Sequence, residues 1–427
     1  MTAGSLLDRL EKRVLAFVPR LSHPATGIML AVMIAGGVVL RVQNVGYPFH
    51  FGFDEHQYVN AAHQFLTGGI DPECCHPPLA KLLVGVGMLL LGNNPEGWRY
   101  MPLVFGLQSI VLAFLMARSL FKDSRAGWLA AAFMSADGFY LTYSRSGLGD
   151  IFLSCLMQWS VFAAISARGW AGVVACAILV GLAASIKWVG LLAGLACCLA
   201  ILLLRRVPWY SMVCFALVPV VHLLVWMLGL YMIGLPNDPL SVWKTIMLRK
   251  SIHLGFPHHS NPLESSWYTW LVMTHPLVIK NATVAGGVKV AASVANPVLL
   301  YAADLCLLGL AVAGGAAALS QRWRERWKAW FDDRSTRAVA ILGAGWLSAM
   351  LLWMTGKIVT YWYHYLSAWG FGIILVAGVV SRLDRRYPKK AMLFVLATFV
   401  VAIFFAPVWA EFPLSRAGVH LRLPFWR

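Results

Sequence analysis

Residues 79–92, LAKLLVGVGMLLLG, form an apolar run whose placement decides how the chain is threaded through a membrane. A membrane-spanning helix needs about 20 mostly apolar residues. This run is shorter and polar residues flank both of its ends, so we interpret it as a helix that lies in the membrane interface. The interpretation fixes the side of the membrane on which every later loop lies, and the distribution of charge tests it.

The composition of the chain is that of a membrane protein. Of its 427 residues, 59% are hydrophobic and 12% are charged, which is roughly half the charged share of a soluble domain. The mean hydropathy is +0.69. The polar residues are too few to cover a water-soluble core, and the same numbers exclude disorder. The first apolar run, 25–40, is followed by no small-residue cleavage site, so it predicts a span rather than a cleavable signal.

Eleven apolar stretches predict spanning helices. The chain is therefore expected to be an all-α polytopic membrane protein with a single integral membrane domain over residues 1–427 and no separate soluble domain. Two large extracytoplasmic loops, 45–100 and 235–293, follow from this order and are expected to contain interfacial helices. The predicted spans are 25–44, 101–120, 126–143, 150–167, 170–186, 188–204, 208–234, 294–318, 338–355, 363–381 and 391–410.

The basic residues support this threading, because Lys and Arg gather on the cytoplasmic side of membrane proteins. If 79–92 crossed the membrane, the basic segments 322–337 and 382–390 would face outward, against this rule. The net charge of +17 is therefore mostly an orientation signal, and nucleic acid is not an expected partner. With the N-terminus inside, 20 of the 35 Lys and Arg residues lie in the inside segments 1–24, 121–125, 168–169, 205–207, 319–337 and 382–390.

The eight cysteines predict no disulfide framework. Six lie in apolar stretches, where a thiol behaves as a small hydrophobe. Cys74 and Cys75 are adjacent in a polar loop; neighbouring cysteines rarely bridge each other, and their role stays open. No CxxC zinc spacing occurs in the chain.

The first large loop carries two kinds of candidate. Asp54 and Glu55 follow the first span directly, where adjacent carboxylates are costly in a partly apolar setting. Neighbours on a helix do not share a face, so one could point at a substrate while the other orients a neighbour or a metal; a solvated loop start is the alternative. The prolines that follow His76 can begin a helix, which places His76 and Lys81 near a positive helix end that suits a phosphate.

Charged groups also mark the outer ends of later helices. Arg99 lies at the mouth of the second span, where anchoring in the interface is the alternative role. Arg145 and Asp150 bracket the turn after the third span, where a structural ion pair that closes the helix hairpin is the alternative. Lys187 and His364 fall at the outer ends of spans by the same threading.

The second large loop adds candidates for acceptor binding or loop packing: His253, His258, Glu264 and Trp267. The spacing of its histidines matches no closed zinc site and no cysteine joins them. Hydrogen bonding to a substrate or packing of the loop is therefore favoured over metal binding. A divalent metal has no support from the residues, and the metal ligands stay unknown.

The chain resembles the protein O-mannosyltransferases, which are polyprenyl-phosphate-mannose-dependent enzymes of the GT-C class. The match runs from about residue 25 to residue 380. It departs from the family in the second loop, where 261–265 reads NPLES instead of His-Pro-aromatic-x-Ser, and the chain is short for the luminal β-trefoil domain of eukaryotic members. The motifs that carry the resemblance, in family order, are Asp54-Glu55, His76-Pro77-Pro78-Leu79-x-Lys81, Gly97-Trp98-Arg99, Asp137-Gly138 with Ser144-Arg145 and Asp150, Ser185-x-Lys187-Trp188-Val189-Gly190, Asn296-Pro297, and Tyr363-His364-Tyr365-Leu366.

The resemblance implies a GT-C fold and an inverting transfer of a sugar from a polyprenyl-phosphate donor on the outer face. Asp54 would be the base that takes the proton of the acceptor hydroxyl, and Glu55 would orient the site. Arginines would be preferred for holding the donor phosphate because their planar fork binds it through two hydrogen bonds. The candidates for holding the donor are His76, Lys81, Arg99, Arg145, Asp150, Lys187 and His364.

The resemblance also implies the setting of the reaction. The expected sugar is mannose, the expected acceptor is a Ser or Thr hydroxyl of an exported protein, and the expected location is a bacterial inner membrane with the N-terminus in the cytoplasm. Transfer of another polyprenyl-phosphate-linked sugar to a lipid or surface glycan is the first alternative. A transporter of lipid-linked sugars is the second, although transporters favour paired repeats and broken helices near the midplane. No cofactor beyond the donor substrate is expected, and the oligomeric state stays open.

Overall fold

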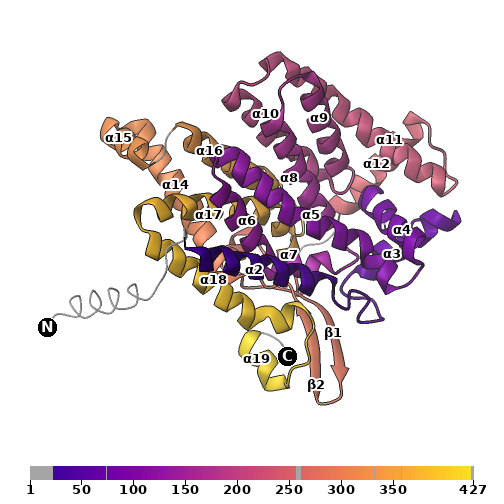
Figure 1. The fold of residues 1–427 in the computed structure, drawn as a ribbon. Helices are drawn as coiled ribbons and strands as arrows, with labels where there is room; N and C mark the ends of the chain where they lie inside the picture. Colours follow the sequence, from indigo (N-terminus) through magenta and orange to yellow (C-terminus); the bar gives the residue numbers. More distant parts are fainter. Residues whose placement is uncertain (1–22, 74, 256–260, 331–332, 357, 425–427) are drawn as a thin grey trace.

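The computed structural model describes residues 23–73, 75–255, 261–330, 333–356 and 358–424, which are mostly helical (Figure 1). Two residues singled out from the sequence, Cys74 and His258, lie outside this part of the chain. Within it, six helical segments are long and apolar enough to cross a membrane: α2 (Pro24–Val42), α5 (Pro95–Phe121), η2 (Trp209–Ala216) with α11 (Leu217–Met232), α14 (Pro297–Leu319), η4 (Trp362–Tyr365) with α17 (Leu366–Arg386), and α18 (Pro388–Trp409).

Shorter helices occupy the remaining predicted spans. Every one of the eleven predicted spans therefore coincides with a helix or with consecutive helical segments, and the helical fold class is confirmed. The number of membrane crossings stays a prediction, since length and hydropathy identify only six in the described residues. The shorter helices are α6 (Ser124–Ser135), α7 (Gly138–Ser144), α8 (Asp150–Ser166), α9 (Trp170–Ala184), η1 (Trp188–Leu192) with α10 (Ala193–Leu204), and α16 (Asp333–Met350) with the short η3 (Trp353–Thr355).

The predicted span 126–143 is not one continuous helix, because the chain breaks at Asp137 between α6 and α7. Asp137 is fully buried. Its carboxylate accepts hydrogen bonds from the backbone N–H groups of Tyr140 and Asn296, each at 2.9 Å. The first N–H groups of a helix have no partner within the helix and need an acceptor when they are buried. Asp137 therefore caps α7 and connects it to the segment that begins α14.

The first large loop folds into α3 (Glu55–Thr67) and α4 (Leu79–Leu91). Helix α4 has 13 residues, which gives a length of about 20 Å, against the ~30 Å of the hydrocarbon core. One side of it, with Ala80, Val84 and Met88, is buried, while Leu89 and Leu90 are exposed. This length and one-sided burial fit a helix at the membrane interface.

The second large loop contains α12 (Pro239–Leu254), α13 (Trp267–Trp270) and an antiparallel hairpin of β1 (Val278–Val284) and β2 (Gly287–Ala292). The helical fold class holds, but the hairpin was not expected, because only helices were predicted in this loop. Branched residues occur at both ends of β1 and alternate at Val288 and Val290 in β2, and Gly286 supplies the positive φ of 80° that the tight turn requires. Val288 also pairs with Leu414, just before α19 (Arg416–Arg422), so the hairpin lies against the C-terminal segment.

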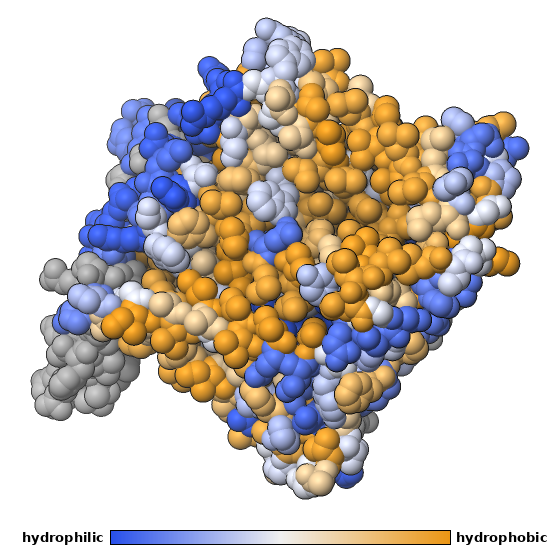
Figure 2. All heavy atoms as spheres, turned by 45° about the vertical axis from the view of Figure 1, so that its right-hand side comes forward, coloured by the Kyte–Doolittle hydropathy of each residue, from blue (hydrophilic) through white to orange (hydrophobic). Residues whose placement is uncertain are grey.

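Two segments that were expected inside meet at one end of the bundle. Arg125 forms an ion pair with Asp384 at 2.9 Å, and Arg385 forms one with Asp123 at 3.3 Å. These pairs connect 121–125 with 382–390. Figure 2 shows a broad apolar surface across the middle of the molecule, with hydrophilic residues gathered along its upper left edge and again at its lower right. An apolar belt between two polar ends is the surface of a protein that crosses a bilayer.

One cysteine departs from the sequence expectation. Cys75 is disulfide-bonded, whereas no bridge was expected in its loop. The other described cysteines are free and are buried or half-buried in the helices, as their apolar surroundings predicted: Cys155, Cys176, Cys197, Cys198, Cys214 and Cys306.

Candidate active site

A cavity of ≈ 330 Å³ lies where the two large loops meet the starts of several helices. It is lined by residues from the start of α3, the loop before α4, the first residue of α8, the segment before η1, the end of α12, and η4. The walls include polar and aromatic side chains, and the size is within the usual range of ligand pockets. Six of the residues predicted from the sequence line it: Asp54, His76, Asp150, Lys187, His253 and His364.

Asp54 presents an available carboxylate to this cavity. It precedes α3 in the left-handed region, with φ 51°, a conformation that is costly for a residue other than glycine and typical of functional sites. The neighbouring Phe53 N–H donates to the carbonyl of Ile279 at 2.7 Å, which holds the turn. The one side-chain hydrogen bond of Asp54 within the described residues is a long contact of 3.5 Å from Gln57 Nε2. Burial raises the pKa of the Asp54 carboxyl, which makes it a stronger base.

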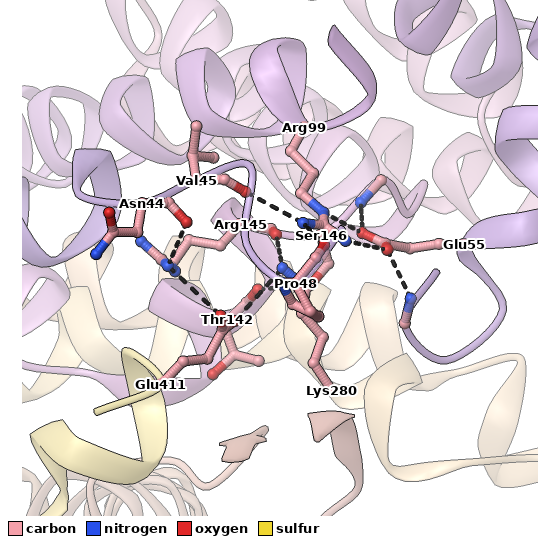
Figure 3. Close-up of polar contacts among 12 residues, drawn as sticks. Asn44, Val45, Pro48, Glu55, Arg99, Thr142, Arg145, Ser146, Lys280 and Glu411 are labelled. Carbon is pink, nitrogen blue, oxygen red and sulfur yellow. Dashed lines mark hydrogen bonds and ion pairs between the residues drawn. The ribbon is translucent and has the colours of Figure 1, made fainter. Parts of the chain in front are cut away.

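Glu55 points away from the cavity and is fully buried. Its two oxygens accept from Arg99 Nε at 2.9 Å and Arg99 Nη2 at 2.8 Å. They also accept from the backbone N–H groups of Gly52 and Gly147, each at 2.7 Å (Figure 3). Burial by itself would raise the pKa of Glu55, but Lys280 and Arg99 hold it at about 2. Glu55 is therefore a permanent anion that fixes the turn carrying Asp54 against the loop before α8.

Arg99 is buried in the same network and does not line the cavity. Besides Glu55, its guanidinium donates to the carbonyls of Val45 (3.3 Å), Pro48 (2.9 Å) and His50 (3.1 Å). The expectation that Arg99 contacts the donor phosphate does not fit this arrangement, since its N–H groups are directed at the first loop.

Arg145 also faces the first loop. Its guanidinium donates to the carbonyls at the end of α2, including Leu40 (2.8 Å) and Asn44 (3.3 Å). Among the described residues, it forms an ion pair with Glu411, at 3.9 Å. The ion pair with Asp150, which was the alternative role, does not form, and Arg145 does not line the cavity. Its placement does not fit the expected phosphate contact, and Figure 3 shows it directed toward Asn44.

Lys280 connects the hairpin to this network, a contact that the sequence did not suggest. It lies on β1, donates to the backbone carbonyl of Arg145, and is 3.5 Å from Glu411. Burial lowers the pKa of the Lys280 ammonium to about 8, although Glu411 opposes the shift. The hairpin thus joins the C-terminal segment to the turn that follows α7.

Lys187 is the one lysine or arginine that lines the cavity within the described residues. Its ammonium is 2.7 Å from Asp150 and 4.9 Å from the centre of the Tyr363 ring. An ammonium held by one carboxylate keeps further N–H donors for a ligand. Asp150 is thus paired with Lys187, whereas the alternative considered from the sequence was an ion pair with Arg145.

Three imidazoles complete the polar lining. The His76 ring lies 5.5 Å from that of His253, and burial lowers the pKa of both, to about 3 for His76. His364 stacks on Trp353 with ring centres 3.9 Å apart. The backbone N–H of Tyr361 donates to His364 Nδ1 at 3.1 Å, so the proton of a neutral ring is on Nε2. Histidines that stay neutral supply hydrogen bonds to an anionic ligand without adding charge.

Lys81 lies outside the cavity in a buried ion-pair cluster. Its ammonium is 2.7 Å from Asp71 and 2.8 Å from Glu73, and Arg249 is 2.9 Å from Asp71. The cluster ties α4 and α12 to the segment between α3 and α4. The expected phosphate contact of Lys81 does not fit, because two carboxylates already surround it.

The chain is similar to known proteins in sequence and in fold. Residues 75–229 match the family model of dolichyl-phosphate-mannose-protein mannosyltransferases, and residues 243–415 match the model of the C-terminal four-transmembrane region of protein O-mannosyltransferases. The chain belongs to the protein O-mannosyltransferase family. A Mycolicibacterium smegmatis polyprenol-phosphate-mannose–protein mannosyltransferase is 24% identical, over 93% of this chain and 92% of that protein. The Corynebacterium glutamicum protein of the same name is 35% identical over 125 residues, 26% of this chain and 24% of that protein.

Solved structures show the same fold. The Saccharomyces cerevisiae Pmt1–Pmt2 protein O-mannosyltransferase complex bound to the sugar donor matches with a TM-score of 0.74 at 12% identity, covering 96% of this chain and 93% of that chain. ArnT from Cupriavidus metallidurans bound to undecaprenyl phosphate matches with a TM-score of 0.57 at 15% identity, covering 90% of this chain and 77% of that chain. The GT-C fold expected from the sequence is therefore confirmed.

Several cavity residues were not predicted as site residues. The phenol-bearing side chains of Tyr58, Tyr143, Tyr361 and Tyr363 line the cavity. Tyr58 could have been found, because it lies four residues after Asp54 and side chains four apart share a helix face. Nothing in the sequence marked Tyr143, since it enters the cavity from the end of α7.

The remaining second-loop candidates lie elsewhere or are not described. Glu264 and Trp267 do not line the cavity, and Trp267 packs against the main hydrophobic core. His258 lies outside the described residues. In the described ranges, no group of three or more His, Cys, Asp or Glu side chains is arranged to hold a metal ion.

Proposed function

We propose that this enzyme transfers mannose from a polyprenyl-phosphate-mannose donor to a Ser or Thr hydroxyl of a protein. The observation that carries the proposal is the cavity in which an available carboxylate, Asp54, and an ammonium, Lys187, are both exposed to a ligand. Family membership supports mannose, because the relatives named above are polyprenol-phosphate-mannose–protein mannosyltransferases.

The proposed step is a single displacement. The acceptor oxygen attacks the anomeric carbon of mannose while its proton passes to the Asp54 carboxylate. The bond between that carbon and the phosphate oxygen breaks, and its electron pair stays on the polyprenyl phosphate. Lys187 and the neutral imidazoles of His76 and His364 stabilise the charge that grows on the phosphate, which lowers the barrier more than it strengthens donor binding. The products are the mannosylated protein and polyprenyl phosphate.

We also propose where the reaction occurs. The N-terminus and the basic segments lie in the cytoplasm, and the cavity opens on the extracytoplasmic side of a bacterial inner membrane. The positive-inside rule supports this orientation, as does the meeting of 121–125 with 382–390 at one end of the bundle. A flexible polyprenyl chain would then remain in the bilayer while its phosphate reaches the cavity from the outer leaflet.

The test is a reconstituted assay with the full chain in liposomes. Labelled polyprenyl-phosphate-mannose and a Ser/Thr-rich peptide are supplied, and the products are identified by mass spectrometry. Hexose on the peptide hydroxyls is the expected result. Label on a lipid or glycan acceptor alone would select the transfer of sugar to another acceptor, and translocation of the intact donor without transfer would identify a transporter.

A further inference from the structure

A second polar cavity lies at the other end of the helices that carry the active site. It has a volume of ≈ 510 Å³. Helix α8 begins with Asp150 in the active-site cavity and reaches the second cavity at Ile165, a length of about 22 Å. The segment of η1 and α10 likewise leads from Lys187 to Leu204. The two cavities are thus separated by most of the thickness of a bilayer.

Four cations converge on the second cavity: Lys122, Arg206, Arg334 and Arg337. Lys122 ends α5 in a left-handed conformation, Arg206 follows α10, and the two other arginines lie in the first turns of α16. The pKa of the Lys122 ammonium is lowered, first by desolvation and then by the like charges of Arg206 and Arg334. A group of cations held together at the end of several helices attracts an anion.

No carboxylate in the described residues forms an ion pair with any of these four cations. The acidic residues at the same end have other partners, since Asp123 pairs with Arg385 and Asp384 with Arg125. The charge of the cavity is therefore not balanced by the described part of the protein.

Capping of helix ends explains only part of this arrangement. Arg206 donates to the carbonyl of Ile165 at 2.7 Å, at the end of α8, and Arg337 donates to Leu203 at 3.4 Å, at the end of α10. Cations at helix C-termini are favourable in their own right. Each of these guanidiniums has five N–H donors, however, and Lys122 and Arg334 have no recorded hydrogen bond from their side chains to the described residues. Donors and charge remain for a ligand.

We propose that the second cavity binds the phosphate group of an anionic phospholipid from the leaflet that surrounds this end of the protein. Basic pockets between helix ends at the membrane surface recognise lipid phosphates through charge and hydrogen bonds. The cavity also has apolar walls at Leu120, Ile165 and Leu204, which suit the glycerol and upper acyl part of a lipid. The inference does not depend on the proposed transfer reaction. Inorganic phosphate offers the same chemistry and is the other source to be distinguished.

The experiment measures lipid retention by the full-length protein with native mass spectrometry. The protein is presented in detergent with phosphatidylglycerol, with phosphatidylcholine, or with inorganic phosphate. The cavity variant is Lys122→Gln with Arg334→Gln, because neither side chain donates a hydrogen bond to another of the described residues. The matched control is Arg322→Gln with Lys328→Gln on α15 (Gln321–Trp330), which removes the same charge from exposed side chains at the basic segment.

We expect the parent and the control to retain phosphatidylglycerol in preference to phosphatidylcholine, and the cavity variant to bind phosphatidylglycerol at least about tenfold more weakly. Partial displacement of the lipid by inorganic phosphate, to the same extent from the parent and the control, would support recognition of the phosphate group. Equal retention of the two lipids, or equal loss in both variants, would overturn the proposal. Binding of inorganic phosphate without binding of phosphatidylglycerol would assign the cavity to the soluble ion and refute the lipid.

Discussion

The two ends of the helix bundle hold their charges in opposite ways. At the active-site end, Glu55 and Arg99 are both fully buried and form an ion pair joined by two hydrogen bonds. At the other end, Lys122 and Arg334 line a cavity and form no ion pair with a described carboxylate. The first arrangement fixes geometry, while the second leaves charge available to the surroundings.

This difference shows why formal charge in a sequence is a poor guide to function. A buried cation with a carboxylate partner is costly to create and costly to disrupt, so it positions a loop. A solvated cation costs little and acts through its field. Lys187 is intermediate, because it is paired with Asp150 and still faces a cavity. The following changes test the contrast, beginning with the largest expected effect.

Replacement of Asp54 by asparagine should have the largest effect on transfer. Asp54→Asn keeps the shape of the side chain and removes the base, so turnover should fall by about 10²-fold or more. Donor binding should remain, since the carboxylate is not a phosphate ligand. Turnover and donor binding are measured on purified protein. The control is Glu325→Gln on exposed α15, which also removes one carboxylate. Near-normal turnover by Asp54→Asn would remove it from the role of base.

Disruption of the Glu55–Arg99 pair should act first on stability. Glu55→Gln leaves a buried guanidinium without a counter-charge, which costs about 3–5 kcal/mol, and the apparent Tm in detergent should fall. The folded-state pKa of about 2 lies below the ordinary value of 4.5, so this stabilisation is complete above pH 4.5 and is lost as the pH falls toward 2.

A second variant separates this charge effect from general damage to the fold. Glu55→Gln with Arg99→Gln removes both charges, so part of the lost Tm should return while the turn before Asp54 remains less ordered and turnover stays low. A Tm for Glu55→Gln equal to that of the parent would contradict the role of the pair.

Removal of the ammonium in the active-site cavity should weaken donor use. Lys187→Met removes the cation that faces the ligand, so the KM for the donor should rise and kcat should fall, each by about tenfold. Lys187→Arg should recover part of the activity. Lys81→Met is the contrasting variant: its lysine is buried with Asp71 and Glu73 outside the cavity, so folded yield should fall with little change in the KM of the folded fraction. A raised KM in Lys81→Met together with a lower folded yield and an unchanged KM in Lys187→Met would contradict this assignment of the two lysines.

Sequence patterns predicted the helices better than the polar contacts. Runs of apolar residues predicted a helix at each expected span because hydropathy is a local property. The break at Asp137 and the hairpin after Leu277 were missed, since each also has a long-range contact: Asp137 accepts from the N–H group of Asn296, and Val288 on β2 pairs with Leu414. These partners are distant in the sequence.

The active site was predicted only in part, again because contacts between residues distant in the sequence decide which side chains face the cavity. Asp54, Lys187 and His364 lie at helix starts on one side of the membrane, and threading alone brings them together. Arg99 and Arg145 also lie at that level, but their guanidiniums turn toward the carbonyls of 40–50 instead of the cavity. No one-dimensional pattern tells an arginine that holds a loop from one that faces a ligand.

The pH dependence of transfer should reveal the environment of Asp54. Burial raises its pKa above the ordinary value of 3.8, and the base is active only when ionised. The value of kcat/KM should therefore fall as the pH falls through this raised pKa, and the residual activity of Asp54→Asn should lack that acidic limb. His76, with its pKa lowered to about 3, should produce no limb near pH 6.5. An acidic limb that persists unchanged in Asp54→Asn would assign it to another group.

The smallest effect on activity, and the sharpest test of the two ends, comes from single cysteines used as topological labels. Glu96→Cys lies at the exposed start of α5, beside the predicted interfacial helix α4, and Glu325→Cys lies on exposed α15. In a background with the free cysteines replaced by alanine and the disulfide-bonded Cys75 kept, both should retain near-parent turnover, because neither residue lines the active-site cavity. A membrane-impermeant maleimide applied to intact cells should label position 96 and should label position 325 only after the membrane is opened.

If α4 crossed the bilayer, residue 96 would lie on the same side of the membrane as the N-terminus. The basic end with Lys122 and Arg206 would then lie outside, against the positive-inside rule. Labelling of position 325 in intact cells would therefore place the second cavity outside and contradict the orientation on which the contrast between the two ends is built.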